Sequence, residues 1–375
     1  MIIMALDHVR DYFHNSAFVY NPTDLSQTTA AIFFTRWITH FCAPVFVFLA
    51  GTSAYLYGAK KNKSSLSFFL FTRGIWLVIV ELFIVTLEWT FNPAYPFFNL
   101  QVIWVTGISM IILSAMIYMH KYLIFIAGVL LIATHNLLDT AHMTGNSISS
   151  FLWALLHEPG YFSFGNFSFS VRYPLLPWPG IISVGYVFGS LYNSFYDSKK
   201  RQRILLLSGC GAIILFVILR MGNLYGDAEH WVLQKNTVFS LLSFLNTTKY
   251  PPSLLYILIT LGPALIFLSL SEKPLNRLTS KIAMFGRVPM FYYLVHIFLI
   301  HLLAIIAVII SGYKWSDMIL STRVNAAPQL NGYGFNLGTV YLIWVAIIIL
   351  LYPFCQWFDK HKKSHQSAKW WLSYF

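Results

Sequence analysis

Long apolar runs alternate with short polar breaks along most of the chain. A helix needs about 20 mainly apolar residues to cross the hydrocarbon core of a bilayer. The pattern therefore predicts an all-α polytopic membrane helix bundle with about ten transmembrane helices. To within several residues, the expected spans are Met1–His14 (a partial span), Trp37–Gly58, Leu70–Thr90, Leu100–Met119, Tyr122–Leu138, Trp178–Phe195, Ile204–Met221, Ser253–Leu270, Val288–Ser311 and Leu337–Trp357.

Two apolar stretches are too short for a full crossing. The first is Met1–Leu6, which ends at the charged residue Asp7. It has no basic segment of the kind that opens a signal peptide. Either the first half of this helix is missing from the chain, or a short helix lies inside the bundle. The stretch Val238–Leu245 is expected to be re-entrant or interfacial.

Composition rules out a soluble domain. Hydrophobic residues make up 57% of the chain and charged residues only 10%, against roughly 25% in soluble domains. The net charge of +12 does not indicate nucleic-acid binding, because the charges lie in breaks between apolar runs.

The basic residues predict the topology. With ten alternating spans, 17 of the 25 lysines and arginines fall on one side, so that side and both termini are expected to be cytoplasmic. The protein is expected in the plasma (inner) membrane. The outer side is then expected to carry the long loops Asp139–Pro177, Gly222–Thr237 and Gly312–Asn336. Residues 1–358 form the predicted transmembrane domain, and residues 359–375 form a basic cytoplasmic tail.

Five ionisable residues lie within one eight-residue stretch of the first helix: Asp7, His8, Arg10, Asp11 and His14. Residues three or four apart share a helix face, which pairs Asp7 with Arg10 and His8 with Asp11. A carboxylate on one imidazole nitrogen fixes the tautomer that a general base needs. The alternative is a solvated helix end with local ion pairs.

Other ionisable residues lie deep in predicted spans. Glu81 is near the middle of one, and His296 is in the middle of another, with His301 five residues later. Intramembrane ionisable groups are costly, and they normally face the bundle interior with a partner. A neutral histidine satisfied by one hydrogen bond is the competing interpretation.

A further polar group is expected at the outer membrane level. Arg36 and His40 stand four residues apart on one helix face, at the level of the first-helix cluster, and Gln101 and Trp104 begin a span there. Nucleotide, zinc-protease and serine-hydrolase motifs are absent, so any chemistry comes from dispersed intramembrane residues.

Several other residues are expected to be inert. Cys42, Cys210 and Cys355 sit far apart in apolar runs, which indicates neither disulfides nor a metal site. Four residues of the long outer loop are expected to be solvated: His142, His157, Glu158 and Arg172.

Six stretches, in order, resemble a bacterial membrane family grouped with the heparan-alpha-glucosaminide N-acetyltransferases. The first is the run Leu6-Asp7-His8-Val9-Arg10-Asp11-Tyr12-Phe13. The others are Arg36–Gly51, Thr72–Leu77 with Glu81, Pro177–Ile181 with Gly185 and Tyr186, Lys249–Ser253, and Phe285–His296. The resemblance spans nearly the whole chain.

The resemblance implies a transmembrane acyltransferase fold. Lysosomal relatives use cytosolic acetyl-CoA and acetylate an amino sugar on the far side, with a catalytic histidine near the luminal end of the first helices. Those relatives have an asparagine near the position of His8, an insertion that places their histidine near His14 and Asn15, and an acid at the position of His40. The fold therefore carries over, and the identity of the base does not.

These observations predict a membrane-embedded transfer of an acyl group from cytoplasmic acetyl-CoA, or another acyl-CoA, to an outer sugar or glycan, without a metal. His8, oriented by Asp11, would act as base or acyl carrier, and Arg36 or His40 would stabilise the oxyanion. The expected catalytic residues are His8, Asp11, His14, Arg10 and His40; the expected substrate contacts are Asp7, Arg36, Gln101, Trp104, Glu81 and His296; the expected donor contacts are Arg73 and Arg287.

Two alternatives stay open. The same residues suit a multispan transporter or flippase of an envelope precursor, or a catalytically inert envelope scaffold. The expected partners are the lipid bilayer and the acceptor, with a homodimer as an open option and no nucleic acid.

Overall fold

A computed structural model describes residues 1–365, so part of the predicted basic tail, residues 366–375, lies outside the described residues. The described chain is mostly helical and divides into two compact units. Unit 1 comprises Met1–Cys42, Phe83–Phe97 and the chain from Pro274 onward. Unit 2 comprises Ala43–Leu82 and Phe98–Lys273.

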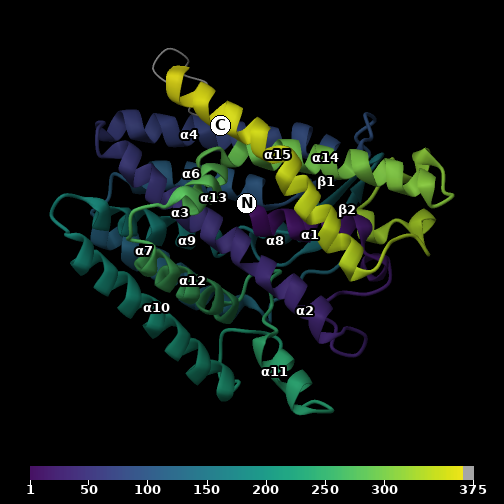
Figure 1. Ribbon diagram of the computed structural model, residues 1–375. Coiled ribbons are helices and arrows are strands. Elements are labelled where there is room, and N and C mark those ends of the chain that lie inside the picture. Colours follow the sequence, from purple (N-terminus) through teal and green to yellow (C-terminus); the bar gives the residue numbers. More distant parts are fainter. Residues whose placement is uncertain (366–375) are drawn as a thin grey trace. The chain divides into compact units, whose positions relative to one another are not determined.

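Unit 1 is built around its N-terminal helix. Its helices are α1 (Ile2–Phe13), α2 (Ala30–Trp37), α5 (Thr86–Thr90), α13 (Arg277–Arg287), α14 (Pro289–Ile310) and α15 (Leu337–His365). Figure 1 shows α1, in purple, against the green α14 and the yellow α15. Short 3-10 helices connect the longer elements at Asn15–Phe18, Ile38–Phe41, Trp315–Met318, Val324–Ala326 and Pro328–Leu330.

Helix α1 has 12 residues, which gives a length of about 18 Å, less than the roughly 30 Å hydrocarbon core. Both of its ends are bound within unit 1. The indole N–H of Trp344 donates to the Ile2 carbonyl at 2.9 Å, and the Phe335 amide donates to the Phe13 carbonyl at 2.7 Å. Ala5, Val9 and Tyr12 are fully buried, so α1 is a core element of the unit.

Unit 2 contains nine α-helices among its described residues, of which α4 pairs with α6, α7 with α9 and α10 with α12. They are α3 (Cys42–Gly58, whose first residue belongs to unit 1), α4 (Lys63–Ile79), α6 (Val102–Met116), α7 (Lys121–Thr134), α8 (Ile148–Leu156), α9 (Trp178–Gly189), α10 (Ser198–Met221), α11 (Thr237–Leu245) and α12 (Leu254–Leu270). A π-helix, Val80–Val85, extends α4. Further short 3-10 helices follow α7 and α9 at His135–Leu138 and Ser190–Tyr192.

Glycine sets the spacing of three helix pairs in unit 2. Gly74 of α4 faces Gly107 of α6, Gly128 of α7 faces Gly180 of α9, and Gly209 of α10 faces Gly262 of α12. A β-carbon added at the first of each pair would lie 2.5, 3.0 or 2.6 Å from the carbonyl oxygen of the second. Small residues allow membrane helices to pack backbone against backbone in this way.

The connections between helices contain a small sheet that the sequence did not predict. Strands β1 (Phe97–Leu100), β2 (Gly160–Phe164) and β3 (Phe167–Val171) form it in the order β1-β3-β2. β2 and β3 are antiparallel, with Gly160 opposite Val171 and Phe164 opposite Phe167. The sheet extends the unit beyond its helices without changing its mostly helical character.

A helix lies at each of the ten expected spans. Among the described residues 1–365, six helical segments are long and apolar enough to cross a membrane, and the count of ten spans stays a prediction. The six are Ala30–Gly58, Lys63–Thr90, Lys121–Leu138, Ser198–Met221, Pro289–Ile310 and Leu337–His365. Helix α11, with nine residues, is too short to cross.

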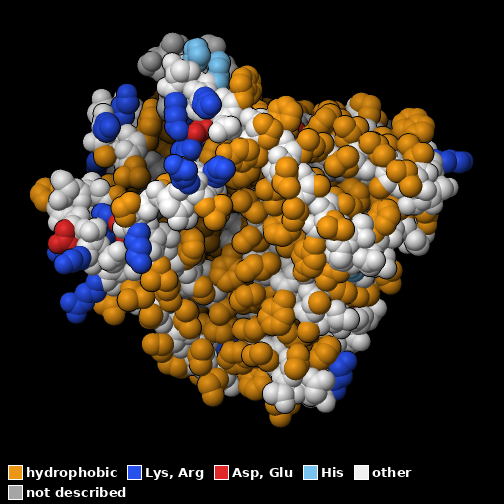
Figure 2. All heavy atoms as spheres, in the orientation of Figure 1, with side chains coloured by type: hydrophobic (Ala, Val, Ile, Leu, Met, Phe, Trp, Pro, Cys, Tyr) orange, Lys and Arg blue, Asp and Glu red, His pale blue; other side chains and the backbone are white. Residues whose placement is uncertain are grey.

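Exposed apolar side chains cover two of the long helices. In Figure 2, orange side chains dominate the visible surfaces of α10 and α15, and blue lysines and arginines gather at the N-terminal end of α10 and the C-terminal end of α15. Such apolar surfaces are expected where helices face lipid tails. The exposed residues include Leu207, Ile214, Ile218, Leu342, Ile349 and Phe354.

The glycine contacts make a stability prediction with a matched control. Gly209→Ala should destabilise unit 2, because the methyl group would lie 2.6 Å from the Gly262 carbonyl oxygen. Overpacking of this kind costs about 1–3 kcal/mol. Gly211→Ala, two residues along the same helix, meets nothing within 4 Å and should leave the thermal unfolding midpoint unchanged or slightly higher. Equal midpoints for the two variants in detergent would contradict the close packing of α10 and α12.

Candidate functional site

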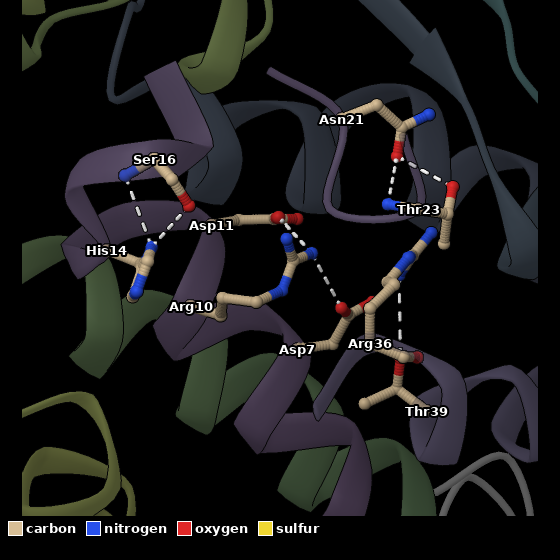
Figure 3. Close-up of polar contacts among 9 residues, drawn as sticks. All are labelled: Asp7, Arg10, Asp11, His14, Ser16, Asn21, Thr23, Arg36 and Thr39. Carbon is tan, nitrogen blue, oxygen red and sulfur yellow. Dashed lines mark hydrogen bonds and ion pairs between the residues drawn. The ribbon is translucent and has the colours of Figure 1, made fainter. Parts of the chain in front are cut away.

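A network of buried charges joins α1 to α2 in unit 1 (Figure 3). Arg10 donates to Asp7 at 2.8 Å and to Asp11 at 2.6 Å, and Arg36 of α2 is ion-paired with the second oxygen of Asp7. The two arginine side chains are only 4% and 7% exposed. Asp7 therefore neutralises two buried guanidinium groups from two helices.

These ion pairs explain how α1 keeps its charges inside the protein. Moving an unpaired ion out of water costs several kcal/mol, whereas a paired and hydrogen-bonded ion is tolerated. Thr39 adds a weaker contact, with its hydroxyl oxygen 3.5 Å from Arg36 Nη1. The sequence-based alternative was a solvated helix end with local ion pairs. The solvated end is wrong, because Arg10, Asp11 and His14 are all buried, whereas a local ion pair is present between Asp7 and Arg10.

The neighbouring residue, His8, is hydrogen-bonded to His296 of α14. Their Nδ1 and Nε2 atoms are 2.8 Å apart, and His296 Nδ1 lies 2.8 Å from the Tyr292 carbonyl oxygen. That carbonyl can only accept, so His296 carries its proton on Nδ1 and accepts at Nε2. His8 must then donate from Nδ1, which leaves the lone pair of the neutral ring on Nε2.

His8 thus has the tautomer of a general base, but its partner differs from the prediction. The helix spacing predicted that Asp11 would orient His8, whereas His296 occupies the Nδ1 position and Asp11 accepts from Arg10. His296 is completely buried and His8 is half-buried. Of the two rings, His8 is therefore the one that a substrate can reach.

Two aromatic residues that the sequence did not single out surround His8. Its ring centroid lies 5.0 Å from that of Trp89 and 6.2 Å from that of Tyr293, both edge-on. Tyr293 stands three residues before His296 and so shares its helix face, which could have predicted from the sequence that Tyr293 lies near the site. Trp89 lies far away in the sequence and carried no such signal.

The other predicted catalytic histidines occupy different settings in unit 1. His14 caps the end of α1, and its Nδ1 accepts from the Ser16 amide at 3.2 Å, which leaves the proton of the neutral ring on Nε2. His40 is buried on the 3-10 helix Ile38–Phe41, a segment that packs against α1. His14 is thus disposed to donate a hydrogen bond, in contrast to His8.

Three predicted substrate contacts lie in unit 2. One oxygen of Glu81 accepts the backbone amides of Ile103 and Trp104, both at 3.0 Å, at the N-terminus of α6. A carboxylate there satisfies amides that have no partner within the helix. The Trp104 indole donates to the Tyr173 carbonyl, and Gln101, the N-cap of α6, is buried. Their predicted convergence with Arg36 and His40 stays a prediction.

The two predicted donor contacts also belong to separate units. In unit 2 the guanidinium of Arg73 lies 5.7 Å from the ring centre of Phe69. In unit 1 Arg287 makes a bidentate pair with Asp359, at 3.0 and 2.8 Å, and Lys363 binds the same carboxylate at 2.7 Å. The Arg287 side chain remains 38% exposed.

One expectation for the long outer loop is wrong. His157 was expected to be solvated, but it is buried and donates to Asp139 at 3.0 Å. Burial alone would raise the pKa of Asp139, but hydrogen bonds from His157 and Asn136 hold that pKa below its ordinary value. His142, by contrast, has a side chain that is 63% exposed. Within residues 1–365, no group of three or more His, Cys, Asp or Glu side chains could hold a metal ion.

Residues 1–223 match the family model described as "Heparan-alpha-glucosaminide N-acetyltransferase, catalytic". The chain belongs to this family. No curated protein and no solved structure gave a significant match. The heparan-alpha-glucosaminide N-acetyltransferase match includes α1 with His8 and the charge network around Asp7, whereas α14 with His296 lies beyond it. Membership agrees with the resemblance seen in the sequence and indicates a multi-pass membrane acetyltransferase.

The charge network predicts a large effect of removing Asp7. Asp7→Ala should destabilise the protein by about 3–5 kcal/mol, because it removes the carboxylate that is paired with Arg10 and Arg36 in a buried site. The thermal unfolding midpoint in detergent checks this. Asp24→Ala, which removes an exposed carboxylate bonded to Ser26 and Gln27, is the control and should change the midpoint little. Similar midpoints for both variants would show that Asp7 does not hold the network together.

Proposed function

We propose that this protein moves an acetyl or other acyl group from acyl-CoA on the cytoplasmic side to a sugar or glycan acceptor on the opposite side of the plasma (inner) membrane. The topology is that of the sequence analysis: ten spans within residues 1–358, a basic tail, and both termini in the cytoplasm. Family membership supports the acetyltransferase class. The observation that carries the proposal is the His8–His296 hydrogen bond.

That hydrogen bond orients His8 for acyl transfer through groups that are neutral before the reaction. The Tyr292 carbonyl fixes His296, and His296 fixes His8, so the His8 Nε2 lone pair faces away from the pair. A fixed tautomer and ring orientation are what a general base or an imidazole nucleophile requires. Because His8 is half-buried, this nitrogen belongs to the accessible member of the pair.

Two routes use the same nitrogen. In the first, His8 Nε2 takes the proton of an acceptor hydroxyl or amine as that atom attacks the thioester carbon. In the second, Nε2 itself attacks the thioester, coenzyme A leaves, and the acceptor then attacks the acyl-histidine. In the second route the His8 Nδ1 proton can pass to His296 Nε2, so the acylated ring stays neutral.

The remaining predicted site residues complete the proposal. The acceptor side of the site is formed within unit 1 by Asp7, Arg10, Asp11, Arg36, His14 and His40. For the unit 2 residues Gln101, Trp104 and Glu81, the role of acceptor contact stays a prediction from the sequence. On the donor side, Arg287 of unit 1 meets the phosphates of acyl-CoA, since guanidinium groups match phosphate geometry. The same role for Arg73 of unit 2 stays a prediction from the sequence. Lys363, bound to the same Asp359 as Arg287, adds a second cation beside that contact.

The first test is single-turnover release of free coenzyme A by purified protein given labelled acetyl-CoA. His8→Ala should abolish release while the unfolding midpoint stays near that of the wild type, because the variant loses the base but not the ion pairs. His142→Ala, which changes an exposed loop histidine, should release coenzyme A at the wild-type rate. Mass analysis under a quench without acid or hydroxylamine distinguishes the two routes by the presence of an acyl group on His8.

Full activity in His8→Ala would remove His8 from the site. Folded wild-type protein that neither binds acetyl-CoA nor releases coenzyme A, but accumulates a solute in proteoliposomes without acyl-CoA, would favour the transporter alternative.

The partner of His8 can be tested separately. His296→Ala removes the acceptor that fixes the His8 tautomer and should lower the transfer rate by roughly 100-fold. In His296→Gln the side-chain amide oxygen can accept from His8 Nδ1, so this variant should recover much of the rate. If alanine and glutamine give the same rate, the hydrogen bond does not orient His8.

A further inference from the structure

Tyr292 lies one helical turn before His296 on the same face of α14. Their rings are stacked, with centroids 4.9 Å apart and planes inclined by 15°. Phe285 of α13 meets the Tyr292 ring edge-on at 5.4 Å. The Tyr292 side chain is fully buried, and its ring packs against His296, the residue that is hydrogen-bonded to His8.

The hydroxyl of Tyr292 has no hydrogen-bond partner among residues 1–365. A buried donor without a partner destabilises a fold, and most buried polar groups avoid this. Tyr12, in the same unit, shows the ordinary solution, because its hydroxyl donates to the Trp89 carbonyl at 2.7 Å. Phenylalanine would fill the same space at position 292 without an unsatisfied hydroxyl. Packing alone therefore does not explain why this residue is a tyrosine.

We propose that the Tyr292 hydroxyl donates a hydrogen bond to the thioester carbonyl oxygen of the acyl donor as that carbonyl is attacked. This inference rests on the proposed function. Tyr292 lies on the N-terminal side of His296 in α14, the end that the proposed topology places toward the cytoplasm. An acyl group entering from that side meets Tyr292 before it reaches His8.

The hydroxyl acts in the step that forms negative charge. The incoming atom, His8 Nε2 or the acceptor atom that it deprotonates, forms a bond to the thioester carbon, and the C=O π pair moves onto oxygen. Tyr292 O–H stabilises that oxyanion. When the pair returns, the C–S bond breaks, and coenzyme A leaves as a thiolate that takes up the proton lost by the nucleophile. A fixed donor in a site without water is effective for this purpose.

The sequence suggested Arg36 or His40 for the same task. Arg36 instead donates to Asp7, on the α2 side of α1. Tyr292 shares a helix face with the histidine that positions His8, and its hydroxyl has no hydrogen-bond partner among residues 1–365.

The test compares two tyrosines that lose the same group. Tyr333 is also buried with a hydroxyl that has no partner among the described residues, but it packs against Phe18 and Phe335. Tyr292→Phe and Tyr333→Phe should both fold with unfolding midpoints at or above that of the wild type. Tyr292→Phe should lower kcat for coenzyme A release by roughly 100-fold with little change in KM, because the hydrogen bond strengthens in the transition state. Tyr333→Phe should keep the wild-type kcat.

A spectroscopic measurement keeps the proposal testable if kinetics are limited by folding or release. In the unreactive His8→Ala background, the infrared stretch of bound acetyl-CoA labelled with ¹³C at the thioester carbonyl should move to higher frequency when Tyr292→Phe is added. An unchanged kcat or an unchanged stretch in the Tyr292 variant, with active wild-type protein, would overturn the role of Tyr292 alone. Wild-type protein without coenzyme A release would overturn the proposed function itself.

Discussion

The ion pairs from Asp7 to Arg10 and Arg36 are the interaction on which the arrangement of unit 1 depends. A helix as short as α1 gains little from its own hydrogen bonds, and its charged residues would favour water over a buried position. Ion pairs between the charged side chains of α1 and α2 offset the cost of burying them. The next residue, His8, is thereby held beside α14, where one hydrogen bond to His296 determines which of its nitrogens carries the lone pair. The ion-paired Asp7 and the hydrogen-bonded His8 are thus consecutive residues of α1.

The polar groups of unit 1 follow a common rule, which is that charges are neutralised locally and reactivity is kept in neutral groups. The arginines and aspartates of α1 and α2 pair with one another, whereas His8, His296 and Tyr292 are neutral groups, two imidazoles with fixed tautomers and one hydroxyl. Neutral groups suit an apolar environment, since an unpaired ion there is costly and a neutral imidazole is not. This division agrees with membership in a family of membrane acetyltransferases.

The sequence predicted the helices well and the site only in part. Hydropathy is local, so helices occur at all ten expected positions, and the clustering of ionisable residues in α1 was visible directly. The sheet was missed because β2 and β3 are five residues each and lie in a loop judged by its polar residues. The partner of His8 was missed because His296 is 288 residues away, and helix spacing offered the nearer Asp11. Trp89 became a neighbour of His8 only through tertiary packing.

The glycine contacts of unit 2 also limit the movement of lipophilic molecules. Where α4 meets α6, α7 meets α9 and α10 meets α12, carbonyl oxygens lie against the neighbouring backbone, and no acyl chain fits between two helices at that distance. At these three helix pairs the close backbone contact leaves no space for a lipid tail between the helices. A lipid tail that enters unit 2 from the side must therefore pass between other helices than these three pairs.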